Sequence, residues 1–104
     1  MVDPSELAYA MLSAQGALLG EVTPALRAVS VKIDGTTVTL TTTFDGEHDQ
    51  DLWDAATSVA AQVIADYPSP WMIDEVIRFR QHPTEAYDAS DGKLVFLRKE
   101  ARLH

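Results

Sequence analysis

The sequence of 104 residues contains no cysteine, which excludes disulfide bonds, thiolate catalysis and sulfur-ligated metal sites. It also lacks any run of about 18 apolar residues, so no membrane-spanning helix is expected. The N-terminal segment Met1–Glu6 has no basic stretch followed by an apolar run and does not resemble a secretory signal. We therefore expect a cytoplasmic protein that does not contact a membrane.

Motifs that carry catalysis or bind cofactors are missing as well. There is no Gly-x-Ser-x-Gly elbow, no glycine-rich phosphate loop and no dinucleotide fingerprint. The three histidines, His48, His82 and His104, are far apart in sequence, and none has a second histidine at helical spacing. The sequence therefore predicts a protein that is not an enzyme, with no catalytic residue and no cofactor.

Lysine and arginine are absent between Ile33 and Ile77, although this segment holds nine carboxylates. The whole chain has 16 acidic and 8 basic residues, a net charge of −8, so the remainder is nearly neutral. About two acids are favoured at a helix start by the helix dipole, but five crowd into residues 45–54. We interpret this run as a surface for a basic partner, with a merely solvated face as the alternative. Its predicted partner-binding residues are Asp45, Glu47, Asp49, Asp51 and Asp54.

The same run imitates the first half of a calcium-binding loop, because carboxylates stand at every second position. The imitation fails at the two positions that matter most. Gln50 replaces the glycine of the sharp turn, and Ala56 replaces the bidentate glutamate. No metal site is therefore predicted. Direct binding of nucleic acid is also disfavoured, because phosphates require a positive patch.

The order of hydrophobic periods predicts one domain over residues 1–104. A period of three to four residues after the Asp3-Pro4 start predicts the first helix, and the same period predicts a second helix over 49–67. Alternation with a period of two predicts strands over 27–33, 36–44, 72–80 and 93–99. The fold class is thus α/β, of the α+β type. In this two-layer α-β-β-α-β-β arrangement, both helices cover one face of a four-stranded, mainly antiparallel sheet.

Details of the strands sharpen this expectation. Asp34-Gly35 is predicted to be the two-residue loop of a hairpin with a type I′ turn. In the returning strand the threonines at 37, 39, 41 and 43 alternate with apolar positions and are expected to line a face in water. Glu75 falls on the apolar side of its strand, which places it at a sheet edge or beside a bulge. Trp53 follows the helical stripe and is expected in the core, whereas Trp71 is a candidate for partner binding.

Several segments resemble small immunity proteins of bacterial contact-dependent growth inhibition systems. These segments are residues 26–31, the Asp34-Gly35 hairpin, residues 44–47 and residues 63–68, within a similarity that spans about residues 16–99. The resemblance implies a protein that binds and neutralises a C-terminal toxin domain encoded beside it. Such toxins are commonly nucleases, often tRNases, with basic clefts that an acidic surface fits.

Two other function classes stay open at this point. One is a small enzyme that uses carboxylates such as Asp74 and Glu75 as acid and base, which would show as a strongly raised pKa in a pocket. The other is a homo-oligomeric structural subunit, which would require a large self-complementary interface.

Overall fold

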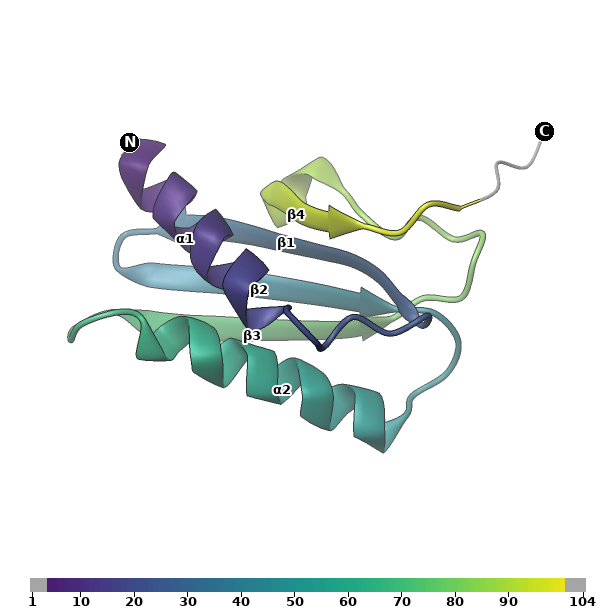
Figure 1. Ribbon diagram of the computed structural model, residues 1–104. Helices are drawn as coiled ribbons and strands as arrows, with labels where there is room; N and C mark the ends of the chain where they lie inside the picture. Colours follow the sequence, from purple (N-terminus) through teal and green to yellow (C-terminus); the bar gives the residue numbers. More distant parts are fainter. Residues whose placement is uncertain (1–3, 101–104) are drawn as a thin grey trace.

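The computed structural model describes residues 4–100, and its order of elements confirms the predicted α-β-β-α-β-β arrangement (Figure 1). The predicted capping residue Asp3 lies outside the described residues. The elements are α1 (Pro4–Ala17), β1 (Leu26–Asp34), β2 (Thr37–Phe44), α2 (Gln50–Ala65), β3 (Met72–Phe79), the short 3-10 helix η1 (Ala89–Asp91) and β4 (Lys93–Leu97).

The four strands form one sheet in the order β3-β2-β1-β4. β1 is antiparallel to both β2 and β4, whereas β2 and β3 are parallel because α2 carries the chain back between them. Both helices cover the same face of the sheet (Figure 1), with α1 over β1 and β4 and α2 over β3 and β2. The structure therefore confirms the expected two-layer fold, in which both helices cover one face of a mainly antiparallel sheet.

The core lies between the helices and this face of the sheet. α1 contributes small side chains such as Ala10 and Ala14, which let the helix backbone lie close to the strands. The buried positions of α2 follow its predicted stripe, and the strands add branched residues that suit a pleated surface. The buried side chains at the centre include Val29, Val31, Val38, Leu40, Ala56, Val59, Ala60 and Val63.

The hairpin turn is shifted by one residue from the prediction. Asp34 pairs with Thr37, so the two loop residues are Gly35 and Thr36. Only Gly35 has a positive φ, 60°, whereas a type I′ turn needs positive φ at both loop residues. The type I′ prediction is therefore wrong, and glycine at the first loop position is typical of a type II′ turn.

The threonine face is not wholly in water, which corrects the second expectation for this hairpin. Thr41 and Thr43 are buried although they lie on the face without helices, and Thr43 is 0% exposed. Arg78 of β3 lies against Thr43, because its guanidinium donates to Thr43 Oγ1 and to Asp91 in η1. The polarity of threonine predicts exposure to water, but the Thr43 hydroxyl accepts hydrogen bonds from Arg78 instead.

Glu75 lies at a sheet edge, one of the two predicted alternatives. The register between β2 and β3 is regular through the Leu40–Glu75 pair, which excludes a bulge there, and β3 is an outer strand. The Glu75 carboxylate accepts a hydrogen bond from Thr57 Oγ1 of α2 at 2.9 Å. An edge position thus lets this carboxylate reach both a helix partner and solvent.

Candidate partner-binding surface

Four of the predicted acidic residues form an exposed surface at the start of α2, and we call Glu47, Asp49, Asp51 and Asp54 the acidic patch. Asp49 is the N-cap of α2 and accepts a hydrogen bond from the Leu52 backbone N–H at 3.2 Å. Asp54 accepts from Gln50 Nε2 at 2.9 Å. No lysine or arginine of residues 4–100 lies within ion-pair distance of these carboxylates. The acidic patch therefore keeps its charge available to a partner.

Asp45 does not share this environment, and for this residue the expectation of an uncompensated charge is wrong. Its carboxylate lies 2.9 Å from Arg98 Nη2 and also accepts the backbone N–H of His82 at 2.8 Å. The hydrogen bond from His82 and then that from Arg98 lower the pKa of Asp45 to about 2. Local sequence does not predict this pair, because Arg98 is more than fifty residues away from Asp45 along the chain.

Asp45 belongs to an ionic cluster with Arg27, Arg98 and Glu100 at the end of the sheet. Arg27 sits in a β-bulge of β1 and is 1% exposed. Its guanidinium donates to both Glu100 oxygens, at 2.7 and 2.8 Å, and to the Arg80 backbone carbonyl at 2.8 Å. Arg27 first, and then Arg98, lower the pKa of Glu100 to about 2. The cluster holds the residues that follow β4 against β1 and so stabilises the fold.

Trp53 is exposed, so its predicted place in the core is wrong. The side chain is 38% exposed on the first turns of α2, among the residues of the acidic patch. Its ring lies 5.8 Å from the His48 ring, which in turn lies 5.3 Å from Phe79. Trp53 lies at the rim of the buried stripe of α2, and the small side chains of Ala56 and Ala60 contact the sheet instead. Exposed tryptophan side chains are enriched at protein interfaces.

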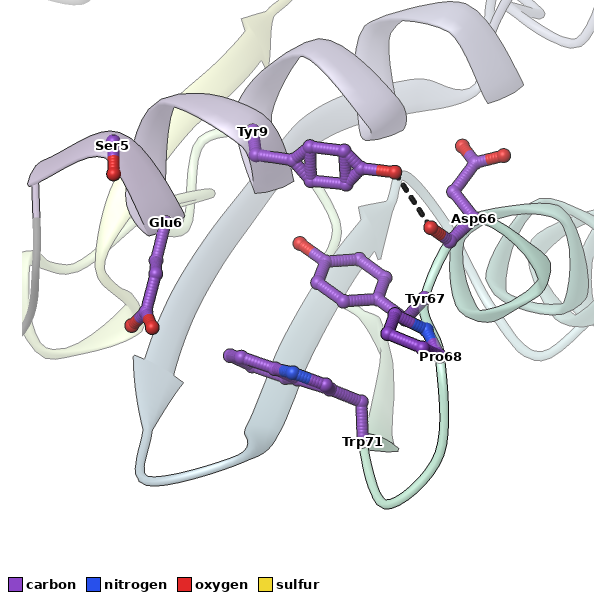
Figure 2. Close-up of a pocket in the computed structure, with 7 residues that line it drawn as sticks. All are labelled: Ser5, Glu6, Tyr9, Asp66, Tyr67, Pro68 and Trp71. Carbon is purple, nitrogen blue, oxygen red and sulfur yellow. Dashed lines mark hydrogen bonds between the residues drawn. The ribbon is translucent and has the colours of Figure 1, made fainter.

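Trp71 lies at the other end of α2, so the structure does not bring all predicted site residues together. The 16 residues of α2 separate the two ends by about 24 Å. Trp71 lines a pocket of about 320 Å³ between α1 and the segment that follows α2 (Figure 2). We call this the Trp71 pocket; it is lined by Ser5, Glu6, Tyr9, Asp66, Tyr67, Pro68 and Trp71.

The side chains of the Trp71 pocket are held from both helices. The Tyr9 hydroxyl donates to the Asp66 backbone carbonyl at 2.6 Å, and Ser13 Oγ donates to the Asp66 carboxylate at 2.6 Å. The Tyr67 ring packs between the rings of Tyr9 and Trp71, each with its centroid 5.0 Å away. The pocket is therefore built by the contact between α1 and the C-terminal end of α2, which sequence periods alone do not place.

The structure offers little to the alternative of an acid–base enzyme. Asp74 and Glu75 are neighbours on β3, so their side chains point to opposite faces of the sheet. Across residues 4–100, no three His, Asp or Glu side chains come together as a metal ion would require. His104 lies outside the described residues. The arrangement at both ends of α2 suits binding through charge and aromatic contact.

Comparison with known proteins adds a family. A family model described as MafI2 immunity protein matches residues 8–100, which include β1 to β4 and most of α1. No curated protein matches this sequence. The match confirms the coarser part of the resemblance, an immunity protein, but it does not name a contact-dependent growth inhibition system. Neither helix of the described chain has the length and hydrophobicity that crossing a bilayer requires.

Proposed function

Because the chain belongs to the MafI2 immunity protein family, we propose that it neutralises a cognate nuclease toxin domain by binding it through the acidic patch. The family supports the coarser statement, an inhibitor of a toxin protein. The nuclease activity of the toxin and the use of the acidic patch are our inference from charge. The protein then acts by occupying a surface of the toxin and needs no reaction of its own.

The observation that carries this proposal is the lack of any cation in the helical layer. Neither α1 nor α2 contains a lysine or an arginine, whereas the acidic patch places four carboxylates at one end of that layer. Four like charges in one place repel one another in the free protein, and a basic partner relieves that repulsion. The patch also attracts such a partner over a distance and speeds its association.

A nuclease is the basic partner that fits this surface best. An enzyme that cleaves RNA, such as a tRNase, needs cationic side chains in its cleft to hold the phosphates. Carboxylates spaced along a loop and a helix can form ion pairs with those cationic side chains in place of the phosphates. RNA is found in the cytoplasm, so we place the inhibitor there as well.

The test uses the C-terminal toxin domain encoded beside this chain and a triple variant, Glu47→Gln, Asp51→Asn and Asp54→Asn. Asp45 is kept because it belongs to the ionic cluster, and Asp49 is kept because it caps α2. We expect the affinity to fall at least about tenfold, mainly through slower association, and to depend less on salt. Surface plasmon resonance at two salt concentrations measures both the rates and the affinity.

A matched control removes three charges elsewhere. Asp34→Asn, Asp74→Asn and Glu85→Gln change exposed carboxylates that are not in the acidic patch and leave the net charge equal to that of the test variant. We expect this control to bind nearly as well as the wild type. Equal binding by wild type and patch variant, without salt dependence, would show that the patch is only a solvated surface.

A further inference from the structure

The Trp71 pocket contains a polar group that the fold leaves without a partner. The Tyr67 hydroxyl is buried, and no hydrogen-bond partner for it lies among residues 4–100. Burial is the main cause that raises the pKa of Tyr67, and the nearby Tyr9, Asp66 and Glu6 add to it. A buried hydroxyl without a hydrogen bond is unfavourable, so a ligand whose docking uncovers it gains by pairing with it.

The pocket also combines carboxylates with aromatic rings but holds no cation. Glu6 and the indole of Trp71 line it, and Figure 2 shows the Tyr67 hydroxyl pointing to the side on which Glu6 lies. The segments that build the pocket, residues 5–9 and 66–71, contain no lysine or arginine. In contrast, the guanidiniums of Arg27, Arg78 and Arg98 are each paired with a carboxylate of the chain.

These groups are the ones that recognise a cationic side chain. An aromatic face attracts a guanidinium or an ammonium ion, and more strongly where water is excluded. A carboxylate pairs with the same cation, and a hydroxyl accepts one of its N–H groups. We propose that the Trp71 pocket receives an arginine or lysine side chain of the toxin, which contacts Glu6 and the Trp71 ring and reaches the Tyr67 hydroxyl as the side chains over it move aside. This inference rests on the proposed function for the identity of the partner.

One toxin domain can reach both surfaces. The Trp71 pocket and the acidic patch lie at opposite ends of α2, about 24 Å apart. An interface of ordinary size covers about 800 Å² on each partner, equal to a disc about 32 Å wide. The pocket then supplies an anchor for one cation, while the patch supplies attraction over a distance. Binding would lay the toxin along the length of α2.

The first experiment measures toxin affinity for two small changes in the pocket, Tyr67→Phe and Glu6→Gln. Tyr67→Phe removes only the unpartnered hydroxyl, so thermal stability should be unchanged or higher while affinity falls about fivefold. Glu6→Gln should lower affinity about tenfold. The matched control is Glu21→Gln, which removes the same charge after α1 and should bind like the wild type.

A second experiment tests the pocket without the toxin. Arginine amide is titrated into the free protein, and the indole N–H signal of Trp71 is followed by NMR after assignment with Trp71→Phe. The signal should shift in the wild type and stay unchanged in Glu6→Gln; no shift in the wild type would overturn the cation pocket.

The outcomes separate the two proposals. If the wild type binds the toxin and both pocket variants bind equally well, the toxin does not use the pocket and the inference is wrong, while the proposed function stands. A shift with arginine amide in that case would assign the pocket to a small free cation. If the wild type does not bind the toxin, the proposed function is wrong, and the toxin is not the source of the cation.

Discussion

Glu100→Gln should destabilise this protein more than any ordinary surface substitution, because it leaves the Arg27 guanidinium buried without a counter-ion. Arg27 is 1% exposed and donates to both oxygens of Glu100. Glutamine can keep one of these hydrogen bonds but supplies no negative charge. Arg98 also contacts Glu100, but it keeps its ion pair with Asp45, so the unpaired charge is that of Arg27.

The expected loss follows from the cost of an unpaired buried charge. Breaking a buried ion pair by removing one partner costs about 3–5 kcal/mol. A small domain has a total unfolding free energy of about 5–15 kcal/mol, so this loss is a large share of it. At a urea dependence of about 1.5 kcal/mol per molar, a loss of about 3 kcal/mol lowers the midpoint by about 2 M.

Urea unfolding followed by tryptophan fluorescence measures the midpoint for the wild type, Glu100→Gln and the control Glu85→Gln. Glu85 is exposed, and its carboxylate also raises the pKa of Arg27, so the control removes an equal charge from the same neighbourhood. The control should lose less than about 0.5 kcal/mol. Adding Arg27→Met to Glu100→Gln should recover part of the loss, since the buried charge is then gone. Equal midpoints for Glu100→Gln and Glu85→Gln would refute this account of the ionic cluster.

Two further predictions concern stability. Gly92→Ala should cost about 3 kcal/mol or more, because its φ is +100° and an added Cβ would lie 2.3 Å from the Val31 carbonyl oxygen; Gly46→Ala, with φ +82° and open space, is the control. An equal fall in the thermal midpoint of both variants would contradict this. Acid should also destabilise the fold. The folded-state pKa values of Asp45 and Glu100 are lowered to about 2 from 3.8 and 4.5, so their stabilisation is complete above about pH 4.5 and is lost as the pH falls towards 2. Urea unfolding across this pH range should show the loss in the wild type and a weaker one in Glu100→Gln.

Most of the fold could be predicted from the sequence because each element carries its own local signal. The stripe of α2 and the alternation of β1 and β2 are properties of neighbouring residues, and the structure confirms both. For Trp53 the local signal is not sufficient. Its helical phase places it on the apolar stripe, but the small alanines of α2 pack on the sheet and leave the Trp53 side chain exposed.

The candidate site could be predicted only where charge is local in sequence. The acidic patch is read directly from residues 47–54, and its four carboxylates are exposed in the structure. No basic residue lies near Asp45 in sequence, so local charge predicts that it belongs to the patch, but the chain after β4 brings Arg98 to it. The Trp71 pocket likewise needs α1 beside residues 66–71, a contact between segments about 60 residues apart.

The position of β4 has a consequence for how the chain folds. Only the β1–β2 hairpin joins neighbouring residues, whereas β1 pairs with β4 between positions such as Ala28 and Leu97. Closing so long a loop is slow, so β4 should join the sheet late. Until β4 pairs with it, β1 is an edge strand with unpaired backbone groups, and the guanidinium of Arg27 has no ion pair with Glu100. Pairing of β4 and the residues after it therefore ends the period in which other chains can add to the exposed edge of β1 and aggregate.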